Sequence, residues 1–515
     1  MSMSPSARHP HPHSGPRRSP SPAIRPVAAV PVVVSALPPA ARAGVAFVAA
    51  LVVALVAIMG VAGPAAALQI PGVPAQEVTV FENVSVLPMT AEAPANNAVL
   101  AGQTVVVEGG RISAMGPAGS VEIPAGARRI DGSGRYLLPG LAEIHAHVPP
   151  GQDPPRELVE EYLFLYLANG ITTIRGMLGA PYQLELREEI RRGEVLGPRF
   201  YVGAPSVNGN TAPTPEAAEA LVRAHAEAGY DFLKIHPGVP GESWDRMVEV
   251  AREVGITWAG HVPADVGIDH AVATGMSTID HLDGYLQVTR RDDLADDAPM
   301  HEVYAATDPG KLEALTRRLA EAGVWQVPTQ YLWNHLNGYV DADSLLALPE
   351  FRYISEGQRM GYRNQAEQRR RNPAITPESD QAHRAMRQDF LRATHAAGVP
   401  ILMGTDSPQL FNVPGFALHR EIPLMVDAGM SAYEVLVSGT RAVARYVEED
   451  LGQPGDFGTV AVGMRADLLL VDGNPLEDLA RLKDPAGVMA EGRWLPREAI
   501  RAGLDTIEAK YAGGN

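Results

Sequence analysis

Apolar and polar residues follow two different periods along this chain, and the two periods alternate after residue 138. Segments such as Pro215–Ala228, Glu242–Val254 and Lys311–Ala322 carry apolar residues three and four positions apart, which predicts amphipathic helices. Between such segments, apolar and β-branched residues cluster in short runs that predict strands. Eight runs fit this description: Leu141–His147, Ile171–Met177, Arg199–Ala204, Asp231–His236, Ile256–Val262, Ser277–Leu282, Val324–Thr329 and Pro400–Asp406.

The alternation of eight strands with helices predicts an α/β fold, namely a (β/α)8 TIM barrel over residues 139–454. The connections after the sixth and seventh predicted strands are much longer than the others. We therefore expect extra structure there, over the face that carries the active site in such barrels.

The segments that flank this region contain short apolar runs separated by turn residues. Before it, Gly109-Gly110 and Asp131-Gly132 divide such runs, and after it Glu491-Gly492 does the same. Residues 77–138 and 455–500 therefore predict a small β-sandwich that is built from both ends of the chain.

The first 76 residues differ in composition from the rest. Residues 1–42 are rich in Ser, Pro and Arg and lack acidic residues, which predicts a disordered basic region. Residues 43–67 combine an uncharged apolar run with a Gly-Pro pair and three alanines, the order found in a secretory signal peptide. We therefore expect an exported protein, periplasmic or secreted. The apolar run is also long enough for one N-terminal transmembrane helix, so a retained membrane anchor stays open, as does a buried helix.

Composition and charge narrow the function. The 515 residues are 46% hydrophobic and 20% charged, which is typical of globular proteins. The net charge is −17, and a surface of this sign repels phosphate backbones, so no nucleic-acid partner is expected. The chain has no cysteine, which excludes thiolate metal sites and thiol nucleophiles. Any metal must be held by His, carboxylate or modified Lys.

Metal-ligand side chains end several predicted strands. His145 and His147 lie two residues apart at the end of the first one, so both imidazoles face the same side. Barrels carry their chemistry at the carboxyl ends of their strands, and four more candidates end other strands there: Lys234, His261, His281 and Asp406. We therefore expect these side chains to converge on a metal.

Each candidate also has an ordinary structural interpretation. A lysine that ends a strand is usually a solvated charge, histidines occur in cores, and Asp406 suits a helix N-cap. His236 follows Lys234 by two residues, so on a strand both side chains point to the same side, and Tyr285 lies four residues after His281. Both are therefore candidates for substrate binding. Their alternative role is packing or a place on the rim.

Several runs, taken together, are similar to a known family. They are Leu138-Pro139-Gly140-Leu141 leading into His145-Ala146-His147, Asp231-Phe232-Leu233-Lys234, Gly260-His261, Ile279-Asp280-His281 and Gly404-Thr405-Asp406. With these runs the chain resembles the amidohydrolase superfamily, and within it the imidazolonepropionase-like and Xaa-Pro dipeptidase-like metal-dependent hydrolases. The run from Gly463 to Leu476 resembles that family's closing sandwich strand, so the resemblance covers residues 77–500.

The resemblance implies a binuclear centre of two divalent metal ions, most often zinc. Its ligand sets would be His145, His147 and Asp406 for one ion, His261 and His281 for the other, and a CO2-modified (carboxylated) Lys234 as the bridge. A hydroxide that bridges the ions would attack the scissile carbonyl, and Asp406 would be the catalytic general base and then acid. A lysine amine that faces two cations is disfavoured as ammonium, which fits a reaction with CO2.

The function implied is that of an exported amidohydrolase that cleaves a C–N bond in a small molecule. A dipeptide such as Xaa-Pro, an N-acyl amino acid or a cyclic amide would be the substrate, and we expect a homo-oligomer. Two residues depart from the family pattern, which commonly has Asp where Glu143 stands and Arg-Asp where Arg175-Gly176 stands. The second change removes a carboxylate and leaves the substrate preference open.

The alternative function belongs to a different class. The barrel would then be a non-catalytic surface binding protein, or a promiscuous enzyme that hydrolyses lactones or phosphotriesters. Metal content distinguishes the two, because a binding protein is expected to hold substoichiometric metal and a hydrolase about two ions per chain.

Overall fold

The computed structural model describes residues 78–90 and 99–513. The predicted basic region (1–42) and the predicted signal peptide or anchor (43–67) lie outside the described residues, so both stay predictions. Among the residues described, no helix combines the length and the apolar character needed to cross a membrane.

Seven of the eight predicted central strands are present, and they pair in parallel. Every residue of the first two is buried, as expected for parallel strands covered on both faces. The strands form a three-stranded sheet of β6 (Leu141–Ala146), β7 (Ile171–Gly176) and β8 (Arg199–Val202), and a four-stranded sheet of β9 (Phe232–Ile235), β10 (Thr257–Gly260), β11 (Thr278–Asp280) and β12 (Trp325–Val327).

The eighth predicted strand, Pro400–Asp406, is not a regular strand. Ile401 makes one bridge to β12, and Ser407, the residue after the predicted strand, makes one to β6. The segment changes partner along its length, and its backbone turns left-handed at Asp406 (φ 63°). On the other side, bridges from Gly203 and Val207 reach β9. The described residues thus show an α/β fold whose regular central strands form two parallel sheets, with single bridges between the sheets on both sides.

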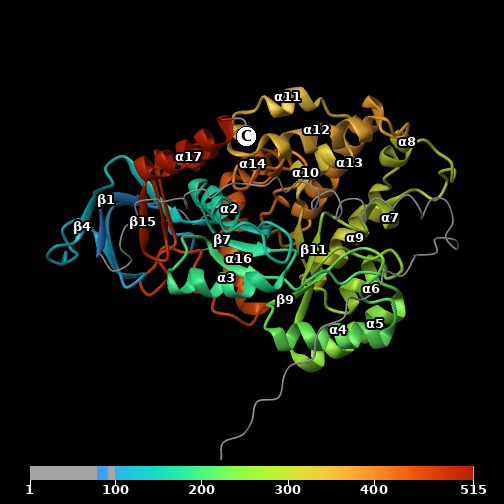
Figure 1. Cartoon of the computed structure of the whole chain (residues 1–515), viewed down its shortest axis with the longest axis horizontal. Coiled ribbons are helices and arrows are strands. Elements are labelled where there is room, and N and C mark those ends of the chain that lie inside the picture. The colour runs from blue at the N-terminus through green and yellow to red at the C-terminus, as the bar shows by residue number, and fades with distance from the viewer. Residues whose placement is uncertain (1–77, 91–98, 514–515) are drawn as a thin grey trace, which may run out of the picture. The chain divides into compact units, whose positions relative to one another are not determined.

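The flanking segments form a further sheet, whose strands come from before and after the central region. In Figure 1 the blue amino-terminal strands and the red carboxy-terminal strands lie side by side, because β13 pairs antiparallel with β5. The eight strands are β1 (Thr79–Val86), β2 (Leu100–Glu108), β3 (Arg111–Pro117), β4 (Arg128–Asp131), β5 (Arg135–Pro139), β13 (Leu468–Asp472), β14 (Gly487–Ala490) and β15 (Arg493–Pro496). Their order is β15-β14-β13-β5-β1-β2-β3, and β4 pairs with β1.

This sheet differs from the predicted sandwich in that hydrogen bonds join all eight strands into one sheet. The sheet curls, and the ring of Trp494 on β15 packs edge-on against that of Phe81 on β1 with 5.2 Å between centroids. The turns at Gly110 and Gly492 also meet, and a Cβ on Gly492 would lie 2.6 Å from the Cα of Gly110. One curled sheet therefore encloses the core that two separate layers were expected to form.

Helices follow most of the central strands and begin and end at ordinary signals. The Thr214 hydroxyl accepts a hydrogen bond from the Ala217 N–H at the start of α4 (Pro215–Ala228), which has the predicted bounds and ends at Gly229 (φ 85°). The other helices described are α2 (Arg156–Ala168), α3 (Pro181–Arg192), α5 (Gly241–Val254), α6 (Gly267–Ala273), α7 (Tyr285–Thr289), α8 (Met300–Ala305), α9 (Pro309–Ala322), α10 (Gln330–Leu336), α11 (Ala342–Leu346), η1 (Pro349–Tyr353), α12 (Glu356–Arg370), α13 (Pro377–Ala396), α14 (Leu418–Asp427), α15 (Ala432–Ser438), α16 (Arg441–Glu449), η2 (Leu479–Lys483) and α17 (Arg497–Ala512).

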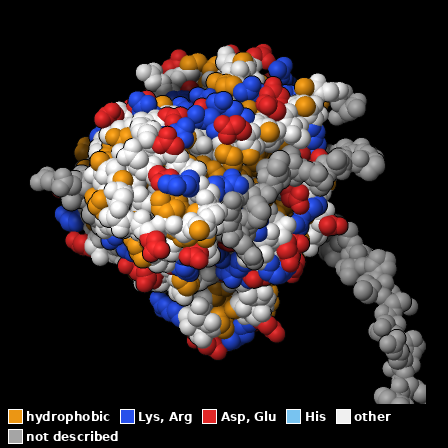
Figure 2. Space-filling view, turned by 90° about the vertical axis from the view of Figure 1, so that its left-hand side faces the viewer, with side chains coloured by type: hydrophobic (Ala, Val, Ile, Leu, Met, Phe, Trp, Pro, Cys, Tyr) orange, Lys and Arg blue, Asp and Glu red, His pale blue; other side chains and the backbone are white. Residues whose placement is uncertain are grey.

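The two long connections hold the extra structure expected of them. The connection after β11 contains α7, α8 and α9, and the one after β12 contains the helices from α10 to α13. Figure 1 shows α10, α12 and α13 gathered beside one another, and α13 also packs on α8. Acidic and basic side chains are interspersed over the face that Figure 2 shows.

Candidate metal centre

Two histidines at the end of β6 lie against one aspartate. His145 Nε2 is 3.5 Å and His147 Nε2 is 2.6 Å from Oδ1 of Asp406. The two imidazoles share a side because they are two residues apart on extended chain, and the bridge from Ser407 to β6 brings Asp406 alongside them. Gln409 donates a further hydrogen bond to Asp406 Oδ1, at 2.7 Å.

His281 forms a compact triad with His145 and Asp406. One ligand atom from each residue lies within 4.8 Å of those of the other two, and His281 Nε2 is 3.7 Å from Asp406 Oδ2. Both His281 (φ 67°) and Asp406 (φ 63°) have the left-handed backbone conformation, which residues other than glycine seldom adopt. Such strained positions cluster at functional sites.

His261 and His236 extend the row of imidazoles. The ring centroid of His261 is 4.5 Å from that of His281, and His236 stacks on His261 at 5.4 Å. The side chains of His147 and His261 are 13% and 19% exposed, whereas His281 is 1% exposed. The cluster is therefore closed at one end and open at the other, where a substrate would arrive.

Lys234 lies on β9 with its amine buried and without a hydrogen-bond partner. Its Nζ is 3.9 Å from Oδ2 of Asp280. On the next strand, a Cβ at Gly260 (φ 122°) would come within 3.1 Å of Nζ, so the glycine leaves room for the amine. Burial lowers the pKa of Lys234 against the opposing charges of Asp280 and Asp406. Burial thus favours the neutral amine, which is the form that reacts with CO2.

The environment favours the protonation states that metal binding requires. Burial holds the pKa of His145 and of His281 well below the ordinary value, so both imidazoles are neutral. Burial alone would raise the pKa of Asp406, but His145, His147 and Lys234 together lower it to about 2, so its carboxylate is ionised. Neutral imidazole and ionised carboxylate are the forms that bind metal.

The donor set fits a divalent metal ion. His281 Nε2 and Lys234 Nζ are both buried without a hydrogen-bond partner among the described residues. Buried polar atoms are nearly always paired, so unpaired ones in one cluster call for an explanation such as a bound ion. Nitrogen and oxygen donors without sulfur suit zinc and similar divalent ions.

Two aspartates that the sequence analysis did not assign to the site support the imidazoles. Asp280 is fully buried, and its Oδ2 is 2.8 Å from His145 Nδ1. Asp283 Oδ2 is 2.7 Å from His261 Nδ1. Carboxylates in such positions orient histidines that ligate metals. The available signal was their spacing in Asp280-His281-Leu282-Asp283, on either side of a candidate ligand.

The two departures from the family pattern, Glu143 and Gly176, lie on the buried strands β6 and β7, and Arg175 precedes the second of them. The carboxylate of Glu143 is buried and accepts hydrogen bonds from the Thr405 hydroxyl and, at 3.1 Å, from the Ser407 hydroxyl. This links β6 to the segment that carries Asp406. Arg175 is also buried, donates to the Ile144 carbonyl at 2.7 Å and lies 3.5 Å from Asp280.

The two predicted substrate contacts have different surroundings. Tyr285 is completely buried, its hydroxyl lies 3.0 Å from the Thr394 hydroxyl, and its ring packs on Phe390 of α13. These contacts give Tyr285 a packing role between α7 and α13 and do not support substrate binding. His236 lies beside His261 at the open end of the cluster and remains a candidate.

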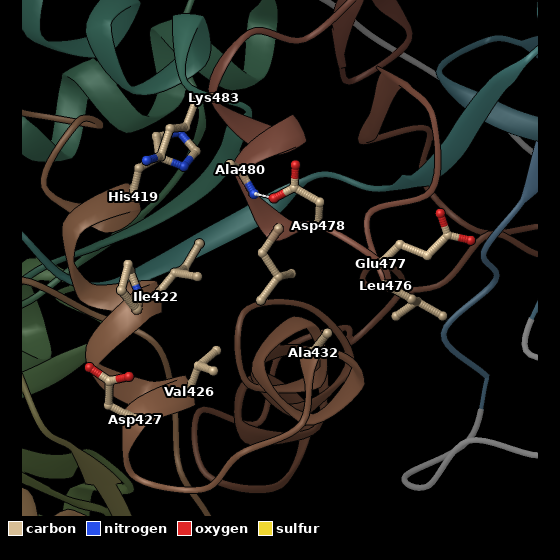
Figure 3. A pocket seen from close by; sticks show the side chains of 12 residues that line it. His419, Ile422, Val426, Asp427, Ala432, Leu476, Glu477, Asp478, Ala480 and Lys483 are labelled. Carbon is tan, nitrogen blue, oxygen red and sulfur yellow. Dashed lines mark hydrogen bonds between the residues drawn. The ribbon is translucent and has the colours of Figure 1, made fainter.

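A separate pocket of about 390 Å³ lies between α14, α15 and η2 (Figure 3). Apolar side chains such as Ile422, Val426 and Leu476 line it, and none of the predicted metal ligands does. In Figure 3, Asp427 and Glu477 point away from its centre. This pocket is therefore not the candidate metal centre.

The chain is similar in sequence to a known family and to several characterised proteins. Residues 136–495 match the family described as "Amidohydrolase family". The chain is 28% identical over 203 residues to adenine deaminase 3 of Rhizobium meliloti, which is 36% of this chain, and it spans only 33% of that relative. It is 26% identical over 448 residues to imidazolonepropionase of Paracoccus denitrificans, covering 80% of this chain and 93% of that protein.

The solved structures include similar folds. A Bifidobacterium longum protein described as a presumed prolidase matches with a TM-score of 0.60 and 25% identity. The match covers 84% of this chain and 100% of that one.

Proposed function

Because the chain belongs to the amidohydrolase family, we propose that it is a metal-dependent hydrolase that cleaves a C–N bond in a small molecule. One observation carries the proposal: the ligand atoms of His145, His281 and Asp406 lie within 4.8 Å of one another, at the ends of three parallel segments. The adjoining His147, His261 and Lys234 complete a donor set that suits two ions.

We assign the proposed ligands as the family resemblance implies. His145, His147 and Asp406 would hold one divalent ion, His261 and His281 would hold the second, and a carboxylated Lys234 would be shared by both. The unpaired buried atoms His281 Nε2 and Lys234 Nζ support this assignment. When bound, the ions would polarise the scissile carbonyl and lower the pKa of water, with zinc as the expected metal.

Asp406 is the proposed catalytic base and acid. Its carboxylate is ionised and is fixed by His147 and by the hydrogen bond from Gln409. In this position it can take the proton of the attacking water and return it to the leaving nitrogen. His236, at the open end of the cluster, is the proposed substrate contact.

The substrate class proposed is a dipeptide of the Xaa-Pro type, an N-acyl amino acid or a cyclic amide. The similarity to an imidazolonepropionase and to a presumed prolidase supports a C–N bond of this kind. The structure of this chain supports a small substrate, because the cluster is buried around the proposed ligands and open to solvent beside His236 and His261.

We infer that the eight central segments form one (β/α)8 barrel. The bridges from Gly203 and Val207 to β9 join the two sheets on one side, and those from Ile401 to β12 and Ser407 to β6 join them on the other. Hydrogen bonds from Leu402 N–H to the Gln326 carbonyl and from Ile144 N–H to the Met403 carbonyl accompany them.

We propose export for the mature protein from the residue order of positions 1–67. A cleaved signal peptide predicts a mature chain that begins after residue 67, and a retained anchor predicts the full chain in the membrane fraction. Sequencing the amino terminus of the purified protein distinguishes these outcomes.

Elemental analysis of the protein expressed with zinc and bicarbonate tests the proposed function. The same sample is assayed against a panel of dipeptides, N-acyl amino acids and cyclic amides. About two ions per chain together with cleavage supports the proposal. A folded protein without metal, or with two ions and no cleavage of any C–N bond in the panel, contradicts it.

A further inference from the structure

A buried arginine on α13 binds the backbone at the ends of two central strands. Arg387 is only 5% exposed, and its Nη1 and Nη2 donate hydrogen bonds to the carbonyls of His281, at 2.9 Å, and Pro328, at 2.8 Å. Its Nε donates to the side-chain oxygen of Gln330 at 2.7 Å. The planar guanidinium can satisfy these three acceptors at once, whereas a lysine ammonium has no such rigid fork.

The two carbonyls adjoin the strained residues of these strand ends. His281 (φ 67°) and Thr329 (φ 48°) are both left-handed, which is costly for residues with a Cβ unless the surroundings hold them. Arg387 binds the carbonyl of the first and the carbonyl just before the second. The side chain of Arg387 therefore stabilises both left-handed turns, at His281 and at Thr329.

The orientation of the His281 ring depends on the same pair of turns. His281 Nδ1 lies 2.8 Å from the Thr329 hydroxyl, which leaves Nε2 buried and unpaired on the side of Asp406. If either strand end moved, the distance between His281 and Thr329 would change and the ring would turn. Within the described part of the chain, the guanidinium of Arg387 bonds the backbone carbonyl of His281 and no side chain of a proposed ligand, so it would act through the backbone.

The position of Arg387 is itself fixed from two sides. Its guanidinium lies over the ring of Trp333 at 5.1 Å, and Gln330 Nε2 donates back to the Arg387 carbonyl at 2.8 Å. The carboxyl group of Glu421 accepts hydrogen bonds from the backbone N–H groups of Gln330 and Tyr331, at 2.8 and 2.7 Å, and so holds the start of α10. These contacts hold the guanidinium in place before any ligand binds.

We propose that Arg387 is a positioning residue for the metal centre, which fixes His281 by binding the backbone at the ends of β11 and β12. This rests on the proposed function, because His281 is a proposed ligand. The long connection after β12 then supports the metal centre in addition to covering the face beside it.

The test uses the full chain carrying Arg387→Met or Arg387→Lys, with zinc alone as the probe. Competition against a chromophoric chelator measures the affinity of both ions, and hydrogen exchange of the metal-free protein measures the opening of residues 281–283 and 329–331. We expect the weaker zinc site to lose about 10- to 100-fold in affinity in Arg387→Met, as is usual when a residue that supports a ligand is removed. Exchange in the two segments should become at least about tenfold faster, because their carbonyls lose donors.

Arg465→Met is the matched control. Arg465 is also buried and pairs with Asp467 and Asp456 beside the curled sheet, and its hydrogen bond to a central strand goes to the Thr173 hydroxyl on β7, at 3.4 Å, and not to β11 or β12. Arg465→Met should lower the free energy of unfolding of the whole protein. It should leave the zinc affinity unchanged. The exchange rate of residues 281–283 should also be unchanged once it is corrected for the lower global stability.

Parent-like zinc affinity and parent-like exchange in a folded Arg387→Met protein would overturn the proposal. If this variant does not fold, Arg387→Lys decides by the same two measurements. We expect a smaller loss of zinc affinity in Arg387→Lys, because an ammonium can still donate a hydrogen bond to one of the two carbonyls. If the parent protein itself binds no zinc, the proposed function fails. The exchange of the metal-free protein still tests whether Arg387 holds the two strand ends.

Discussion

Asp283 Oδ2 lies 2.7 Å from His261 Nδ1, and both side chains are about one-fifth exposed, at 20% and 19%. The imidazole at the open end of the cluster is therefore oriented by a carboxylate two residues beyond His281. This pair leaves Nε2 of His261 as the nitrogen available to an ion, because Nδ1 is engaged.

Asp283→Ala is expected to weaken zinc binding about 10- to 100-fold, since the ring of His261 loses the partner that orients it. Zinc competition with a chelator measures the change. Asp245→Ala is the control, because Asp245 makes a similar 2.7 Å pair with His270 on the exposed surface. Equal zinc affinities for both variants would rule out a supporting role for Asp283.

Lys234→Ala should remove one of two ions and nearly all turnover while the protein stays folded. The reason is that Lys234 is the only proposed ligand shared by both ions. Elemental analysis should fall from about two ions to about one, and added bicarbonate should raise the activity of the parent but not of the variant. Lys311→Ala, which breaks a surface pair with Asp292, is the control. Normal activity in Lys234→Ala would disprove the bridging assignment.

Asp406→Asn keeps the shape of the side chain and removes its capacity to carry a proton. We expect most of the metal to remain and kcat to fall by about 10²- to 10⁴-fold, the usual contribution of a general acid or base. Steady-state kinetics with parallel metal analysis separates the two effects. Asp478→Asn, beside the separate pocket, serves as the control. An unchanged rate would require a different base.

Glu421 makes stability depend on pH. Burial raises its pKa to about 7 against the lowering effect of the N–H groups of Tyr331 and Gln330. Between pH 4.5 and 7 the folded protein therefore keeps a proton that the unfolded chain has released. Folding takes up this proton, so the free energy of unfolding falls as pH rises through this window, by at most about 3 kcal/mol.

In Glu421→Gln, this contribution to the dependence of the free energy of unfolding on pH should disappear. Urea unfolding at several pH values between 4.5 and 7 measures it. The exposed Glu477→Gln should keep the parental slope. A Glu421→Gln protein with the parental slope would mean that Glu421 is ionised in the folded state throughout the window.

Much of the fold could be predicted because helices and parallel strands leave local patterns. The run Pro215–Ala228 forms a helix with the predicted ends, since Thr214 and Gly229 provide local signals at both ends. The segment Pro400–Asp406 has the composition of a strand but forms single bridges, because its partners on β6 and β12 lie far away in the sequence. No local pattern indicates such a change of partner.

The candidate site was predictable only in part for the same reason. The order of His145, His261, His281 and Asp406 at strand ends places them on one face, and the structure brings His145, His281 and Asp406 together. The supporting role of Arg387 depends on a helix packing against two strand ends, and nothing around it in the sequence distinguishes it from a surface arginine. Tyr285 follows His281 by four residues, yet the turn after β11 directs it towards α13.

The pairing of β5 with β13 has a consequence for synthesis. Arg135 and Asp472, which face each other across these strands, are 337 residues apart in the chain. An emerging chain can form β1 to β4 early, but β5 stays without this neighbour until residues 468–472 have been made. Pairings over such distances are slow to form, and an unpaired strand edge can bind other chains. The curled sheet therefore stays incomplete until the ribosome has passed Pro496, and until then its open edge is exposed to association with other chains.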